Sequence, residues 1–119
     1  ASKPQSLHDS LLLQLGCQSL SEDDRRLGEA FIPHLDESGY IEGSLDQLAA
    51  ELGTSVERLE AVLRIIQQFD PPGVGARNLR ECLMLQLEAE GLQQSLAYRM
   101  LDFYQKTIAE FSHHAPASA

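Results

Sequence analysis

Apolar residues recur every three or four positions along most of the chain, while the strict alternation typical of strands is weak. The pattern therefore predicts an all-α fold, a small helical bundle. Six helical segments are expected, with apolar stripes that begin near Leu7, Leu27, Leu48, Val56, Leu79 and Leu96. The first four follow residues that favour N-cap positions, namely Ser6, Ser21, Ser44 and Thr54.

The third and fourth predicted helices are spaced like a helix-turn-helix unit. Gly53 suits the left-handed position of the turn between them, and Ala49 is small where the two helices would cross closely. The second helix, however, carries Glu57 and Glu60 around Arg58, whereas DNA readers offer basic and amide side chains to phosphates and bases. We therefore expect this unit to pack as protein and to make no direct DNA contact.

The segment from Phe69 to Asn78 interrupts the helical pattern with a corner. Adjacent prolines cannot continue a helix, and glycines adopt backbone angles that other residues avoid. Asn78 stands three residues before Glu81, which is the spacing of a capping box for the next helix. Arg77 could pair with Asp70 across the bend. We assign the role of orienting the flanking helices to Phe69, Asp70, Pro71, Pro72, Gly73, Gly75, Arg77 and Asn78.

This corner divides the chain into two expected lobes. Residues 6–69 are predicted to form an N-terminal helical lobe that contains the helix-turn-helix-like unit. Residues 70–111 would form the corner and two following helices, and residues 112–119 a flexible tail. A length of 119 residues with 43% hydrophobic content suits one domain or two such small lobes.

Acidic side chains are concentrated in the first half of the chain. Residues 1–60 carry twelve acidic and four basic side chains, and residues 61–119 carry six and five, for a net charge of −9. Because such an acidic half repels nucleic acid phosphates, a protein partner is expected, unless the acid serves solubility alone. No apolar run is long enough for a membrane span, so no membrane partner is expected.

Residues that could carry chemistry are sparse. The four histidines lack the spacing of a metal site, most serines stand at helix caps, and the glycines at 73 and 75 are not part of a phosphate-binding loop. Cys17 and Cys82 are too far apart for a paired motif and are expected to be buried free thiols in a reducing cytoplasm. We therefore expect no enzyme, no cofactor, no metal and no small-molecule ligand.

Several of these segments resemble one known family. The opening Ser6-Leu7-His8-Asp9, the turn Asp36–Ile41 and above all the stretch Phe69–Leu87 resemble the core-binding region of bacterial sigma-54 RNA polymerase sigma factors. The resemblance covers residues 6–90, and Asn78 replaces an aspartate that is usual in the family. It implies a helical, cytoplasmic module that binds core RNA polymerase. Other parts of such factors are missing, so we expect a cut-out domain or a shortened paralogue.

A docking module of this kind would use apolar side chains that the core leaves over. The apolar candidates are Leu13, Ile32, Tyr40, Met84 and Leu85, each of which could instead complete the fold. Arg80, beside the corner, is a further candidate contact whose role the sequence leaves open. The alternative function is a helix-turn-helix DNA-binding transcriptional regulator. A decoy that occupies polymerase without supporting initiation would differ from a docking module only in biological context.

Overall fold

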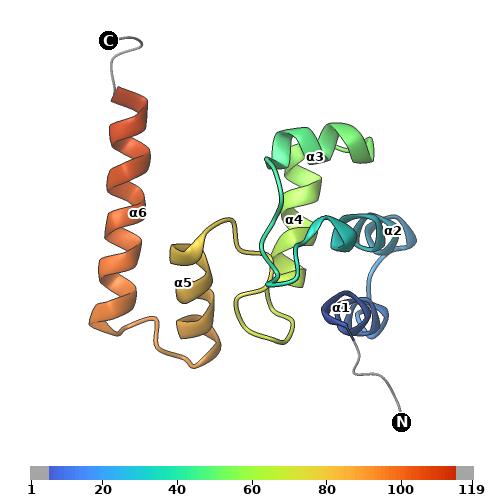
Figure 1. Ribbon diagram of the computed structural model, residues 1–119, viewed down its shortest axis with the longest axis horizontal. Helices are drawn as coiled ribbons and strands as arrows, with labels where there is room; N and C mark the ends of the chain where they lie inside the picture. Colours follow the sequence, from blue (N-terminus) through green and yellow to red (C-terminus); the bar gives the residue numbers. More distant parts are fainter. Residues whose placement is uncertain (1–5, 115–119) are drawn as a thin grey trace.

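Figure 1 shows the computed structural model, which describes residues 6–114 as a chain of helices. Within those residues the one strand-like pairing is an isolated bridge between Leu35 and Ile41, so the predicted all-α class is confirmed. The elements are α1 (Leu7–Gly16), α2 (Glu22–Phe31), the 3-10 helix η1 (Ile32–His34), α3 (Leu45–Leu52), α4 (Val56–Ile66), α5 (Leu79–Ala89) and α6 (Leu96–His114).

The helix starts follow the predicted caps, with one shift. The hydroxyls of Ser6, Ser21 and Ser44 each accept a hydrogen bond from the backbone N–H three residues ahead. At α4, the prediction of Thr54 as the cap is wrong, because Ser55 caps the N–H of Arg58 at 3.1 Å. The N–H of Thr54 instead donates to the carbonyl of residue 49 and closes the end of α3.

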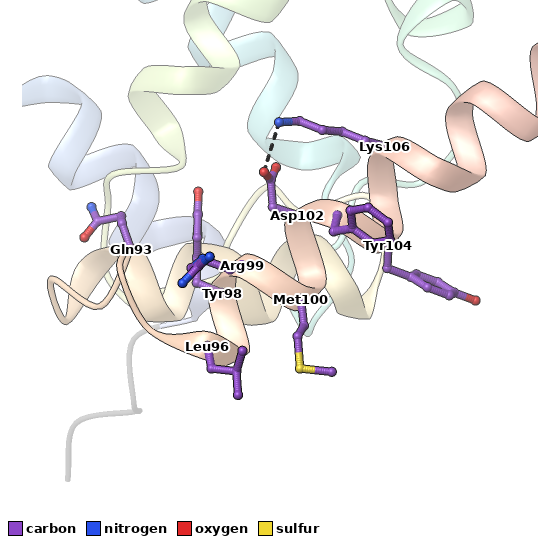
Figure 2. Close-up of a pocket in the computed structure, with 9 residues that line it drawn as sticks. Gln93, Leu96, Tyr98, Arg99, Met100, Asp102, Tyr104 and Lys106 are labelled. Carbon is purple, nitrogen blue, oxygen red and sulfur yellow. Dashed lines mark ion pairs between the residues drawn. The ribbon is translucent and has the colours of Figure 1, made fainter.

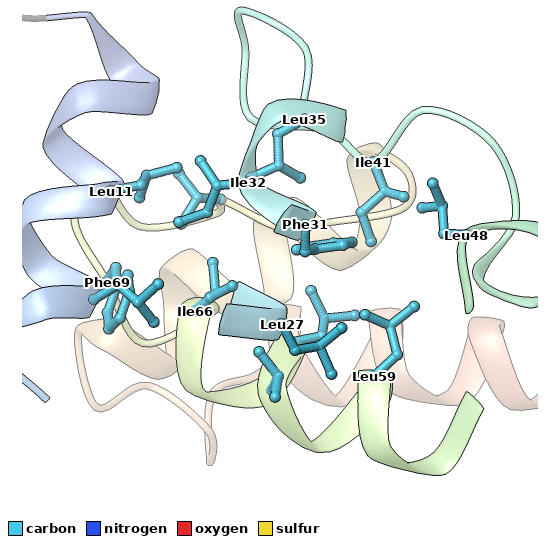
Figure 3. Close-up of a cluster of buried hydrophobic side chains, with 14 of the residues drawn as sticks. Leu11, Leu27, Phe31, Ile32, Leu35, Ile41, Leu48, Leu59, Ile66 and Phe69 are labelled. Carbon is cyan, nitrogen blue, oxygen red and sulfur yellow. The ribbon is translucent and has the colours of Figure 1, made fainter. Parts of the chain in front are cut away.

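The first four helices and η1 share one apolar core, in which α2 packs against α1, α3 and α4 (Figure 3). Helices α1 and α2 cross closely, since a Cβ atom built on Gly28 would lie 2.9 Å from the side chain of Leu15. The buried cluster consists of Leu11, Leu15, Leu27, Phe31, Ile32, Leu35, Ile41, Leu48, Ala49, Leu59, Val62, Leu63, Ile66, Phe69 and Val74. The last two belong to the predicted corner, so the corner is part of this core.

Helices α5 and α6 form a hairpin beside this lobe (Figure 1). The hydroxyl of Tyr98 donates to Glu88 Oε2 at 2.9 Å, and the guanidinium of Arg80 lies 4.4 Å from the ring centre of Tyr104. The first contact joins the start of α6 to the end of α5, and the second joins the start of α5 to the middle of α6, so the two helices run antiparallel. No helix in the described part of the chain is long and apolar enough to cross a membrane.

The structure differs from two predictions made for residues at the ends of helices. The thiol of Cys17 is exposed, contrary to expectation, because α1 ends at Gly16 and leaves the next residue outside the core; Cys82 is half-buried. Helix α6 continues to His114, into the segment 112–119 that was expected to be a tail. Residues 115–119 of that segment lie outside the described residues.

Replacing Leu59 with alanine tests the core of the N-terminal lobe. The side chain of Leu59 is fully buried, so Leu59→Ala should lower the free energy of unfolding by about 2–5 kcal/mol through lost burial and an unfilled cavity. Urea denaturation followed by circular dichroism measures this change. The matched control is Leu13→Ala, an exposed leucine, which should change it by no more than about 0.5 kcal/mol. Equal effects of the two substitutions would contradict the packing described.

Candidate functional site: the corner and the surfaces around it

The corner between α4 and α5 is anchored by buried residues. Phe69, Val74 and Ala76 are almost completely shielded from solvent, although they lie in a segment without regular secondary structure. Each of these side chains removes apolar surface from water and so stabilises one backbone position of the corner. The corner therefore has a defined conformation, as its predicted orienting role requires.

Side-chain amides tie the corner to two helices. Gln14 of α1 donates from Nε2 to the carbonyl of Asp70 at 2.8 Å, and its Oε1 accepts the backbone N–H of Asp70, also at 2.8 Å. Gln67, at the end of α4, donates from Nε2 to the carbonyl of Gly75 at 3.0 Å. The first half of the corner is thus held by α1 and the second half by α4.

The turn between η1 and α3 supports the corner from another direction. The backbone N–H of Gly75 donates to the carbonyl of Gly39 at 2.8 Å, and that of Ile41 donates to the carbonyl of Ala76 at 3.0 Å. The Asp36 carboxylate shapes this turn by accepting the N–H groups of residues 38 and 40. Two segments recognised separately in the sequence, the turn and the corner, therefore form one hydrogen-bonded unit.

The two glycines of the corner are required by both backbone angle and space. Gly73 has φ +102° and Gly75 has φ +80°, which other residues rarely adopt. A Cβ atom on Gly73 would lie 2.6 Å from Cys82 Sγ, and one on Gly75 would lie 3.0 Å from Leu63 Cδ1. The glycines therefore permit α5 and α4 to approach the corner closely. The thiol of Cys82 also contacts Tyr40 and raises the pKa of the Tyr40 hydroxyl.

The predicted cap of α5 is present in altered form. Asn78 Oδ1 accepts the N–H of Glu81 at 2.8 Å, as expected. The carboxylate of Glu81, however, accepts the backbone N–H of Arg77 at 2.7 Å, one residue earlier than a standard capping box.

The suggested ion pair between Arg77 and Asp70 is absent. The Arg77 guanidinium lies 3.5 Å from Glu60 of α4 and 3.6 Å from Glu81 of α5. The backbone of Asp70 is held on the α1 side by Gln14, whereas Arg77 lies between α4 and α5. Because Arg77 and Glu60 are 41% and 40% exposed, their pair contributes only about 0–1 kcal/mol. Glu81 is less exposed, at 18%.

The candidate partner contacts divide into exposed and buried residues. Leu13 is 62% exposed on α1, and Tyr40 and Arg80 are half-buried. Ile32 is fully buried, because the chain tightens at Pro33 into η1 and continues the buried stripe of α2. Met84 and Leu85 are also buried, at 8% exposure. These last three side chains therefore complete the fold, which is the alternative that the sequence left open for each of them.

Sequence reasoning missed an exposed apolar surface on α6. The α6 stripe, as we call it, has exposed fractions between 54% and 72% and consists of Leu96, Met100, Phe103 and Tyr104. Within the described residues, α5 is the helix that packs extensively against α6, and it leaves these four side chains exposed. Figure 2 shows Leu96 and Met100 directed away from the hairpin, beside an open cavity of about 660 Å³.

The helix-turn-helix-like pair α3 and α4 presents little positive charge. Arg58, in the first turn of α4, lies 3.2 Å from Asp24 of α2, and Arg64 is the other basic residue of the helix. Glu57 beside Arg58 is exposed, and Glu60 takes part in the ion pair with Arg77. The geometry of a DNA reader is thus present without the charges that would bind phosphates.

Comparison with known proteins identifies the family. The family of the sigma-54 factor, core binding domain, matches residues 1–116. The chain belongs to this family. It is 48% identical over 87 residues to the RNA polymerase sigma-54 factor of Acidithiobacillus ferridurans, an alignment that covers 73% of this chain and 18% of that protein.

Two further sigma-54 factors show similar identity to this chain over a similar part of its length. The factor of Pseudomonas aeruginosa is 44% identical over 90 residues, and that of Salmonella typhimurium is 40% identical over 86 residues. These alignments cover 72% and 70% of this chain and 18% of each relative, so the chain spans about a fifth of the length of these proteins. The sigma-54 core binding domain is a non-catalytic family, so the chain is not an enzyme.

Substituting the corner glycine tests the geometry of the site. Gly73→Ala places a side chain at φ +102° and against Cys82, so we expect a loss of about 1–3 kcal/mol in the free energy of unfolding. The double variant Pro72→Ala with Gly73→Ala should also widen the range of angles between the lobes. Urea denaturation measures the first effect, and NMR measurement of helix orientation the second. Gly16→Ala, where a Cβ meets no other atom, is the control. Unchanged stability and unchanged helix orientation would contradict this account of the corner.

The pKa of Tyr98 provides a test of the hairpin. Partial burial and the hydrogen bond to Glu88 raise the pKa of Tyr98 to about 12. The folded state therefore favours the neutral hydroxyl, and this contribution is complete below the ordinary tyrosine pKa of about 10. It is lost as the pH rises from there towards 12. Absorbance titration at alkaline pH, with Tyr98→Phe as the reference, should assign the late ionisation to Tyr98. Ionisation of Tyr98 near its ordinary pKa would count against the contact.

Proposed function

We propose that this chain binds core RNA polymerase as a docking module of a sigma-54-type transcription initiation factor. The observation that carries the proposal is the corner, the most specific part of the resemblance to sigma-54 factors. Its backbone is tied to α1, to α4 and to the turn at Gly39. A partner would therefore meet the N-terminal lobe and the hairpin as one preorganised surface, which lowers the entropic cost of binding.

We propose two contact surfaces for the polymerase. One is the pair Leu12 and Leu13 on α1, where Leu13 is the most exposed of the large hydrophobic residues in the first four helices. The other is the α6 stripe, because a contiguous exposed apolar face commonly marks a protein interaction site. Tyr40 and Arg80 would act indirectly, by supporting neighbouring side chains. Tyr40 interacts with Cys82 of α5, and Arg80 stacks on Tyr104 of the α6 stripe.

The helix-turn-helix-like unit raises the alternative of a DNA-binding regulator. The acidic first half of the chain and the pairing of Arg58 with Asp24 favour the protein-docking function. We propose further that the chain acts in the bacterial cytoplasm, where core RNA polymerase lies.

Charge introduced at either surface should weaken polymerase binding. Leu13→Asp and Met100→Asp each place a carboxylate where an apolar contact is expected, so each should raise the Kd for core polymerase about tenfold or more. Binding is measured with purified core enzyme and the full chain. Gln18→Asp adds the same charge at an exposed polar position outside both surfaces and serves as the control.

Three results would count against parts of this proposal. No binding of the unmodified chain to core polymerase would reject the docking function itself. Tight binding to non-specific duplex DNA that weakens steeply with salt would favour the regulator. A Kd unchanged by Leu13→Asp or by Met100→Asp would exclude the corresponding surface.

A further inference from the structure

We propose that Gln14 is a positioning residue for polymerase binding, because its side chain fixes the direction in which the chain leaves the N-terminal lobe. The inference rests on the proposed docking function and assigns a role to a residue that is itself part of neither proposed surface. Gln14 lies on α1, 56 positions before Asp70 in the sequence.

Both polar atoms of the Gln14 amide are used on a single backbone residue. Nε2 donates to the Asp70 carbonyl and Oε1 accepts the Asp70 N–H, each at 2.8 Å. This arrangement needs a donor and an acceptor on one planar group, which a carboxamide supplies and a carboxylate does not. Nε2 also lies 3.3 Å from Ser10 Oγ, one turn earlier on α1, which helps to orient the amide.

The hydrogen bonds of Gln14 hold the backbone at Asp70, where few other interactions do. Phe69 before it is buried in the core, and Pro71 and Pro72 after it have no N–H with which to bond. The Asp70 N–H is therefore the last backbone donor before Gly73. Hydrogen bonds from Gln67 and to Gly39 hold the chain only from Gly75 onward.

Loss of the amide contact would thus act locally. Phe69 and Val74 would remain in the core, since their burial depends on packing and not on Gln14. The exposed segment Asp70–Pro72 would lose its tie to α1 and gain freedom. Gly73, which directly follows this segment, lies against Cys82 of α5. We therefore expect the angle between the hairpin and the N-terminal lobe to vary more widely.

The same helix carries the proposed polymerase contact at Leu13, directly before Gln14 in the sequence. One rigid element would then both present an apolar contact and set the placement of the hairpin. Binding that uses the two lobes together would lose affinity when the hairpin is no longer held in one orientation.

Three variants of the full chain separate hydrogen bonding from packing. Gln14→Leu keeps the bulk of the side chain and removes both hydrogen bonds. Gln14→Glu keeps its shape, but places an acceptor against the Asp70 carbonyl. Gln18→Leu, at an exposed glutamine just beyond the end of α1, is the matched control. The readouts are the Kd for core polymerase, the urea midpoint, and residual dipolar couplings measured separately for α1–α4 and for α5–α6.

We expect Gln14→Leu and Gln14→Glu to unfold cooperatively and to raise the Kd about three- to tenfold, as lost preorganisation would. The couplings of α5–α6 should shrink relative to those of α1–α4, while Gln18→Leu should behave as the unmodified chain. If Gln14→Glu matches the unmodified chain, the hydrogen bonds do not matter and the inference is wrong.

Two other outcomes also overturn it. Unchanged couplings in both Gln14 variants would show that the amide does not hold the hairpin. Altered couplings with an unchanged Kd would show that the held angle does not serve binding. Absence of binding by the unmodified chain would instead reject the docking function on which the inference depends, so the two failures can be told apart.

Discussion

The structure depends on holding one irregular segment, the corner from Phe69 to Asn78, in a single conformation. A chain rich in proline and glycine has no repeating hydrogen-bond pattern of its own, so its conformation must be imposed by its surroundings. Here three kinds of interaction hold the segment in one conformation. They are the buried side chains at positions 69, 74 and 76, the amide contacts from Gln14 and Gln67, and the backbone hydrogen bonds to the turn at Gly39. Helices far apart in the sequence thereby determine where α5 begins.

The N-terminal lobe and the hairpin are stabilised in different ways. The first four helices bury a common core and are stabilised by one another. The hairpin buries Met84 and Leu85 and has a few specific contacts, such as Arg80 with Tyr104, while the α6 stripe faces outward. A part with few buried contacts has low local stability, so its orientation relies on the corner to a greater extent than the N-terminal lobe does.

The α3 and α4 pair shows that a shape does not define a function. The turn glycine, the crossing alanine and the buried second helix match a helix-turn-helix, yet Arg58 is paired with Asp24 and its neighbours are acidic. DNA affinity depends on phosphate neutralisation, which this face lacks. The pair serves the core of a sigma-54 core binding domain, in agreement with the expectation drawn from charge.

The sequence by itself determined what local interactions control: the helix starts at Ser6, Ser21, Ser44 and Asn78, and the glycines of the corner. These features depend on neighbours within a few residues, and their signals can be read along the chain. Only the tertiary structure decided the burial of Ile32, the exposure of the α6 stripe, the partners of Arg77 and the grip of Gln14 on Asp70. Each of these depends on which helix lies opposite, and helical periodicity identifies an apolar face without identifying what covers it.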